Sequence, residues 1–333
     1  MLGARAAVLG LVGGSLFVGA VSQRLNSRNV VFALSIVCVS EAFYFFRTKS
    51  SIPRLSRAQS LRARTTSEEL IPRDVLFGNP EYASPTISPD GELLAYLRPA
   101  DGVLNAWVRS VGKTDDRVVT NDRVRGIRGV SWAEDSKTLL FNQDEGGDEN
   151  FHLYAIDATT PGAVAVDLTP YDGAKAQNVM TNKRYPEQLL VATNKRDPAA
   201  FDMYRIDLPK ALAGDVLGAT ELDTVNPGDV VGWGAEDSSF EVRHAVVKNQ
   251  ADSSTTVRIL ESKGKDVHSN EWRDLITFPY GEDGRFVDFC ADGESGLMLS
   301  TIGRDTTALL KISLENGETK EVIAANDKVI LLC

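Results

Sequence analysis

The sequence predicts an all-β protein: a β-propeller of about five four-stranded blades, preceded by a basic, hydrophobic leader. Two observations carry this prediction. Past residue 66 the chain consists of short β-type runs separated by Gly, Pro, Asp and Asn, which is typical of antiparallel strands joined by tight turns. These runs also recur as a unit of constant design. Because no helical pattern of 10–15 residues alternates with the strands, a parallel α/β sheet is disfavoured.

The charge of the chain separates the leader from the body. The 333 residues carry a net charge of -10. Residues 1–66 contain nine Lys or Arg and one acid, a net charge of +8, which leaves -18 for residues 67–333. A strongly acidic body repels phosphate backbones, so nucleic acid is not an expected partner.

The leader, residues 1–66, contains two apolar runs at 6–23 and 30–46, followed by an Arg- and Ser-rich linker. Each run is near the lower limit of about 17 residues for crossing a bilayer, so one or two hydrophobic helices and membrane contact through residues 6–46 are expected. Glu41 makes a lipid-facing second run costly. Three interpretations stay open: a membrane anchor, a cleaved organelle-targeting segment, and mistranslated upstream sequence without a role.

The body, residues 67–333, repeats a short strand, a polar turn, a hydrophobic strand, a polar loop and an aromatic-centred strand. A weaker fourth strand closes the unit. The expected strands are 84–88, 92–98, 105–111 and 117–120; 129–132, 137–143, 151–157 and 163–168; 178–182, 187–194 and 201–207; 230–234, 239–247 and 255–261; and 286–290, 296–302, 307–313 and 320–324.

The spacing of the units fits propeller blades. When the third strands are aligned, the steps from one unit to the next are 47, 50, 53 and 53 residues, on Trp107, Tyr154, Tyr204, Val257 and Leu310. Four strands in about 40–50 residues is the period of a blade.

Individual residues support the same architecture. Asp90-Gly91 supplies the left-handed residue that a tight hairpin needs. Asp157 and Asp207 end equivalent strands and are expected to cap turns. The aromatic side chains at repeated blade positions are expected in the core between blades: Trp107, Trp132, Trp233 and Tyr154.

The cysteines and histidines argue against a disulfide-stabilised protein and against a zinc-binding protein. The three cysteines, Cys38, Cys290 and Cys333, are too far apart in the sequence to form a C-x-x-C pair or a disulfide framework. The three histidines form no H-x-x-x-H pattern, so no ligand set for zinc is present. Neither a metal nor a cofactor is expected.

Three segments resemble a known family. They are FNQDEGGDENFHLYAID at 141–157, SPTISPDGELLAYLR at 84–98 and LLVATNKRDPAAFDMYRIDL at 189–208. Together they resemble the amino-terminal propeller of the prolyl oligopeptidase family of serine peptidases, nearest to its acylaminoacyl-peptidase and dipeptidyl-peptidase-like branches. The resemblance covers residues 70–325 approximately and is looser after the third unit.

The resemblance implies a ring of seven or eight blades and a carboxy-terminal α/β-hydrolase domain, whose nucleophilic Ser lies in G-x-S-x-G. The five units here are incomplete relative to that ring. The nearest pattern, Gly293-Glu294-Ser295-Gly296, has its second Gly one residue too early. We therefore expect no catalytic residue in this chain.

Several functions remain open after this resemblance. The favoured expectation is the propeller portion of a peptidase, which filters peptides in full-length relatives and lacks the catalytic triad here. The alternative is a stand-alone propeller, membrane-tethered or not, that serves as a protein-interaction scaffold. An incomplete gene product is the third. The expected partner is a peptide or a protein on the propeller face.

The acidic stretch 144–149 provides the candidate binding residues, Glu145, Asp148 and Glu149. In exopeptidase members of the family, propeller carboxylates hold the free α-amine of the substrate by charge-assisted hydrogen bonds. The competing interpretation is a solvated loop in which Gly146 and Gly147 form the turn. His152 follows within a strand, where a structural role is expected.

Overall fold

The computed structural model describes residues 7–12, 15–20, 71–78 and 80–328. The chain divides into two compact units, Met1–Leu70 and Ile71–Cys333, which are considered separately. The second unit contains five antiparallel four-stranded sheets, and in each sheet consecutive strands are hydrogen-bonded neighbours. Each sheet is therefore a simple meander, the construction of a propeller blade.

The first blade contains β3 (Ala83–Ile87), β4 (Leu93–Ala100), β5 (Val103–Ser110) and β6 (Arg117–Val118), after a short helix α2 (Arg73–Phe77). The second contains β7 (Ser131–Trp132), β8 (Thr138–Gln143), β9 (His152–Asp157) and β10 (Val166–Asp167). The third contains β11 (Ala176–Thr181), β12 (Gln188–Asp197), β13 (Ala200–Asp207) and β14 (Thr220–Thr224). The fourth contains β15 (Val230–Ala235), β16 (Val242–Lys248), β17 (Thr255–Ser262) and β18 (Glu271–Phe278). The fifth contains β19 (Gly284–Phe289), β20 (Ser295–Ser300), β21 (Ala308–Ser313) and β22 (Thr319–Ala324).

These strands confirm the all-β repeat that the sequence predicts. Two short helices in the third blade, α3 (Leu208–Leu212) and α4 (Val216–Ala219), were not anticipated. Each begins at an aspartate whose side chain accepts a backbone N–H, Asp207 from Lys210 at 3.0 Å and Asp215 from Gly218 at 3.0 Å. Such N-caps stabilise a helix start, so Asp207 caps a helix instead of the expected turn. The turn cap expected at Asp157 is present, because its Oδ1 accepts the backbone N–H of Thr159 at 2.8 Å.

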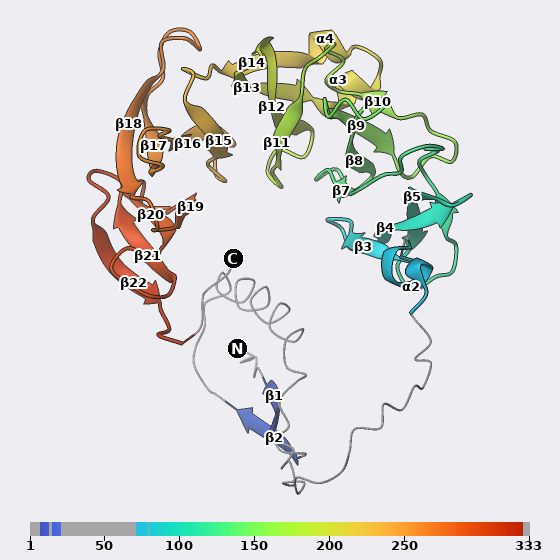
Figure 1. Cartoon of the computed structure of the whole chain (residues 1–333), viewed down its shortest axis with the longest axis horizontal. Helices are drawn as coiled ribbons and strands as arrows, with labels where there is room; N and C mark the ends of the chain where they lie inside the picture. The colour runs from blue at the N-terminus through green and yellow to red at the C-terminus, as the bar shows by residue number, and fades with distance from the viewer. Residues whose placement is uncertain (1–6, 13–14, 21–70, 79, 329–333) are drawn as a thin grey trace, which may run out of the picture. The chain divides into compact units, whose positions relative to one another are not determined.

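Consecutive blades lie side by side in chain order (Figure 1). The first strands of the blades, β7, β11, β15 and β19 among them, lie on the inner side of the arrangement, and the last strands, such as β14, β18 and β22, lie on the outer side. Loops that precede the first strands therefore approach the inner side of the blades.

Each hydrophobic core cluster joins two consecutive blades. Leu139 and Phe141 of β8 pack with the first blade, whereas Leu140 of the same strand packs with the third. The third blade repeats this alternation, with Leu189 facing the second blade and Leu190 the fourth. Successive side chains of a strand point to opposite faces. A blade that is buried on both faces thus needs continuous apolar runs rather than alternating ones.

Tryptophan side chains reinforce the contact between blades. Trp132 and Trp233 are each 6% exposed and belong to inter-blade clusters, as predicted. The indole of Trp132 donates to the carbonyl of Thr86 in the first blade at 3.2 Å. Trp107 differs, because it is half-buried beneath the guanidinium of Arg98, 5.2 Å from the ring centroid.

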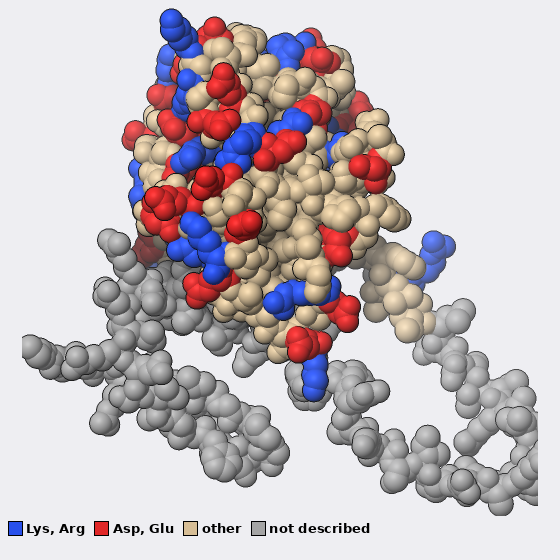
Figure 2. All heavy atoms as spheres, turned by 90° about the vertical axis from the view of Figure 1, so that its left-hand side faces the viewer, with Lys and Arg blue, Asp and Glu red and all other residues tan. Residues whose placement is uncertain are grey.

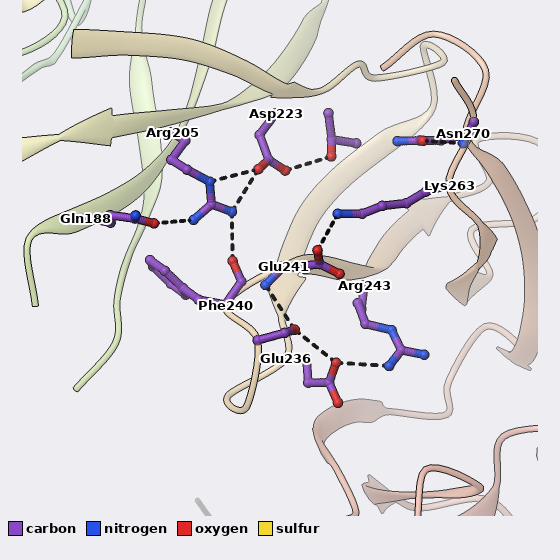
Figure 3. Close-up of polar contacts among 12 residues, drawn as sticks. Gln188, Arg205, Asp223, Glu236, Phe240, Glu241, Arg243, Lys263 and Asn270 are labelled. Atoms are coloured by element: carbon purple, nitrogen blue, oxygen red, sulfur yellow. Dashed lines mark hydrogen bonds and ion pairs between the residues drawn. The ribbon is translucent and has the colours of Figure 1, made fainter. Parts of the chain in front are cut away.

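Arg205 of β13 connects the third and fourth blades (Figure 3). Within its own blade the guanidinium donates to Gln188 at 2.9 Å and to Asp223 at 2.8 Å and 3.1 Å. It also donates to the backbone carbonyl of Phe240, in the turn between β15 and β16, at 2.8 Å. One cation therefore fixes that turn of the fourth blade against the third.

Acidic and basic side chains are interspersed on the face of the fourth and fifth blades shown in Figure 2. Arg258 illustrates the pattern, with carboxylate oxygens of Asp229 and Asp274 at 2.7 Å and 2.6 Å. In the fifth blade Lys311 pairs with Asp292 at 2.9 Å. The negative charge of the body is thus partly neutralised locally.

The expected helix in the first apolar run is wrong for the residues described. Ala7–Val12 (β1) and Ser15–Ala20 (β2) form an antiparallel two-stranded sheet. The sequence between the strands, Gly-Gly, is a two-residue hairpin signal, and Gly disfavours a helix by about 1 kcal/mol per residue. The second run, residues 30–46, lies outside the described residues. Within the described part of the chain, no helix has the length and apolar character needed to span a membrane.

Candidate functional site

The acidic stretch forms the loop between β8 and β9 in the second blade. Gly146 and Gly147 adopt left-handed backbone angles, with φ of 63° and 94°. Glu149 has a φ of 62°, which is uncommon for a residue with a side chain. The turn predicted at the two glycines is therefore present, and Glu149 extends the left-handed geometry.

Arg125 fastens this loop to the connection between the first and second blades. Its Nε lies 3.2 Å from Oδ1 of Asp144, whose side chain is 3% exposed. The guanidinium also lies against Gly147, where an added Cβ would be 2.5 Å from Nη1. Glycine suits position 147 because of its left-handed backbone angle, and it leaves room for the Arg125 guanidinium beside it.

The three candidate carboxylates, Glu145, Asp148 and Glu149, are all exposed. Asp148 accepts hydrogen bonds from the backbone N–H of Asn150 at 3.0 Å and from its side-chain amide at 3.1 Å. These hydrogen bonds hold the pKa of the Asp148 carboxyl below its ordinary value. The loop therefore presents negative charge to solvent from a backbone fixed at Asp144.

An open cavity of about 610 Å³ lies between the second and third blades, at the end of β8 and β9 that carries this loop. Its lining includes the cations Arg128 and Lys175 and the aromatic ring of Phe151. The Arg128 Cζ is 5.5 Å and the Lys175 Nζ 5.6 Å from the ring centroid of Phe151. This arrangement is the part of the site that the sequence analysis missed.

The missed residues gave only a weak signal in the sequence. Arg128 precedes β7 and Lys175 precedes β11, so both belong to connections between blades. A basic residue in a polar connection resembles any other solvated charge. Only the packing of two successive blades shows that both cations meet the same aromatic ring.

Two other residues singled out by the sequence occupy structural positions. His152 Nδ1 lies 2.7 Å from a carboxylate oxygen of Asp167 on the neighbouring strand β10. Ser295, in the Gly-Glu-Ser-Gly segment, is buried in β20, where Lys320 donates to its hydroxyl at 3.0 Å. Both side chains therefore connect strands of their own blades.

No family model matches the sequence. Curated relatives do match. The chain is 32% identical over 300 residues to dipeptidyl aminopeptidase BIII of Pseudoxanthomonas mexicana, which covers 89% of this chain and 40% of that protein. It is 31% identical over 148 residues to dipeptidyl peptidase family member 6 of Caenorhabditis elegans, which covers 42% of this chain and 20% of that protein. The chain thus spans less than half the length of the relatives it matches.

Solved structures are also similar. Oligopeptidase B from Leishmania major has a TM-score of 0.47 and 11% identity, covering 72% of this chain and 34% of its own. A puromycin-hydrolysing peptidase from Mycobacterium tuberculosis has a TM-score of 0.49 and 13% identity, covering 73% of this chain and 38% of its own.

The meandering four-stranded sheets, with cores shared between neighbours, define the class of the second unit as a β-propeller. The sequence relationship to dipeptidyl peptidases then places the chain within the prolyl oligopeptidase family, as the propeller portion of such a peptidase. The resemblance expected from the three sequence segments is thereby confirmed.

Proposed function

We propose that the chain is a peptide-binding propeller that admits substrates with a free amino terminus. The observation that carries this proposal is the 32% identity over 300 residues to a dipeptidyl aminopeptidase, a match that includes 89% of the chain. An aminopeptidase must recognise the amino end of its substrate. In this chain the exposed carboxylates of Glu145, Asp148 and Glu149 offer acceptors for that charged amine.

The geometry of the loop supports this assignment. Asp144 is held by Arg125, so the loop backbone is anchored at its start. The carboxylates that follow are exposed, and Asn150 orients that of Asp148. An ammonium group has three donors and no acceptor, and it requires several oxygen atoms around it. Three carboxylates within five residues meet that requirement.

Calorimetric titration of the full 333-residue chain tests the proposal. The probes are tetra-alanine amide with a free amino terminus and its N-acetylated counterpart. We expect the free amine to bind at least tenfold more tightly, because a charge-assisted hydrogen bond contributes about 1.5–3 kcal/mol.

Variants then assign the interaction to the loop. Glu145→Gln, Asp148→Asn and Glu149→Gln together are expected to remove the preference for the free amine. Glu221→Gln, which changes an exposed glutamate in β14, is the matched control and is expected to leave it unchanged. Equal affinity for the two peptides would refute the proposal.

A further inference from the structure

We propose that Arg128, Lys175 and Phe151 form a binding site for the carboxylate of a bound peptide. The cavity described above brings together Arg128 from the connection before β7, Phe151 from the loop before β9 and Lys175 from the connection before β11. This inference rests on the proposed function, because it assigns a second specificity to the same peptide-binding end of the propeller.

The two cations are available to a ligand. In the described part of the chain, neither Arg128 nor Lys175 forms an ion pair, and the aromatic ring of Phe151 is the group that each approaches. Arg258, by contrast, is paired with carboxylates of Asp229 and Asp274 at 2.7 Å and 2.6 Å.

The aromatic ring orients the cations without neutralising them. A cation placed over an aromatic face gains about 0.5–1 kcal/mol at an exposed site and keeps its full charge. Arg128 and Lys175 both hold this position on Phe151. Both charges line the same cavity, so a carboxylate bound there is attracted by both.

The remaining lining fits an anionic group carried by a peptide. The amide of Gln177 adds a donor, while Leu140, Leu153 and Ala176 are buried apolar residues in the wall. A free inorganic anion has no apolar atoms that could pack against this wall. A peptide has both a carboxylate and apolar atoms to place there.

The position of the cavity gives the site a direction. Phe151 immediately precedes β9, and the acidic loop separates it from β8. The acidic loop and Phe151, the ring that both cations approach, thus lie at the same end of β8 and β9. A peptide with its amine at the acidic loop has its carboxylate directed to the cations, an electrostatic arrangement that fixes orientation.

The test uses peptides that lack an α-amine, so that the acidic loop does not contribute. The probes are N-acetyl-Ala-Ala-Glu-amide, N-acetyl-tri-alanine with a free carboxylate, and neutral N-acetyl-Ala-Ala-Gln-amide. Calorimetric titration of the full chain is expected to show about tenfold tighter binding of at least one acidic peptide than of the neutral one. The tighter of the two acidic peptides identifies the source of the carboxylate, a side chain or the carboxyl terminus.

Variants assign the effect to the two cations. Arg128→Gln and Lys175→Gln are each expected to remove most of the tenfold advantage, whereas Arg128→Lys, which keeps the charge, retains most of it. Arg123→Gln is the matched control, because Arg123 lies nearby in sequence and pairs with exposed Asp101. Thermal unfolding of every variant verifies that the fold is preserved.

Two results would overturn this inference. One is equal affinity for the acidic and neutral peptides. The other is an acidic preference that persists in the double variant Arg128→Gln with Lys175→Gln. Either result leaves the amine preference of the acidic loop intact, because that preference is measured with different peptides. Failure of this inference and failure of the proposed function are therefore distinguishable.

Discussion

Gly234 lies directly opposite His244 on the neighbouring strands β15 and β16, and its missing side chain provides the space that the imidazole occupies. A Cβ at position 234 would lie 1.8 Å from Cε1 of His244. The ring packs against Phe286 and Phe289 of the fifth blade, with centroid separations of 4.8 Å and 6.2 Å. A glycine in one strand thus permits the contact of the fourth blade with the fifth.

Gly234→Ala is expected to lower the free energy of unfolding by about 1–3 kcal/mol, because the added methyl group forces the imidazole from its place. Urea denaturation measures this change. Gly232→Ala is the matched control, since a Cβ there would contact Val246 at an ordinary 3.7 Å. The double variant with His244→Ala should regain part of the loss. A wild-type stability for Gly234→Ala alone would contradict the packing described.

The pH dependence of stability is expected to contain a contribution from His244. Burial lowers its pKa from 6.5 to about 4, and its Nδ1 has no hydrogen-bond partner among the described residues. In the unfolded chain the imidazole of His244 therefore binds a proton near pH 6.5, whereas in the folded chain it binds one only near pH 4. Stability is complete above pH 6.5 and falls as the pH drops toward 4, by up to about 3 kcal/mol.

Urea denaturation between pH 7 and pH 4 compares the unmodified chain with His244→Leu. The variant should lose less stability over this interval, because its side chain does not titrate. Other groups contribute equally to both proteins, so the difference between the two curves isolates His244. His268→Leu, at an exposed position, should follow the unmodified chain. Parallel curves for His244→Leu and the unmodified chain would exclude the imidazole as the cause.

Arg205→Leu is expected to cost about 3 kcal/mol of unfolding free energy. The change leaves Oδ2 of Asp223, whose side chain is 16% exposed, without its two guanidinium donors and frees the carbonyl of Phe240. Arg184→Leu, which removes an exposed pair with Asp237 at 3.9 Å, is the control and should stay within about 0.5 kcal/mol. Similar losses for both variants would show that Arg205 does not connect the blades energetically.

Arg125→Gln is expected to loosen the acidic loop without unfolding the blade. Asp144, almost fully buried, loses its ion-pair partner, and the local opening free energy should fall by about 1–2 kcal/mol. Hydrogen exchange of residues 144–150 should therefore accelerate roughly tenfold, while exchange in β12 stays unchanged. Arg123→Gln, which removes an exposed pair, should leave the loop as it is. Unaltered loop exchange in Arg125→Gln would refute this role.

The strands could be predicted from the sequence because their signals are local. The run at 187–194 and the tight turn at Asp90-Gly91 specify a strand and a hairpin through the nearest neighbours alone. The prediction failed at Ala7–Val12 and Ser15–Ala20, where an apolar, Gly-rich run fits both a helix and a hairpin. An apolar run of this length does not by itself distinguish the two.

The sequence by itself determined the blade repeat, the separation of a basic leader from an acidic body, and the family, since periodicity, composition and motif order are properties of the linear chain. Only the tertiary structure decided which side chains meet between blades. Arg128 and Lys175 both approach the ring of Phe151, and the imidazole of His244 occupies the space beside Gly234. Such contacts depend on how the strands pack and on their register. Segments far apart in the sequence pack closely only in the folded chain, and the volumes and charges of their side chains must match there.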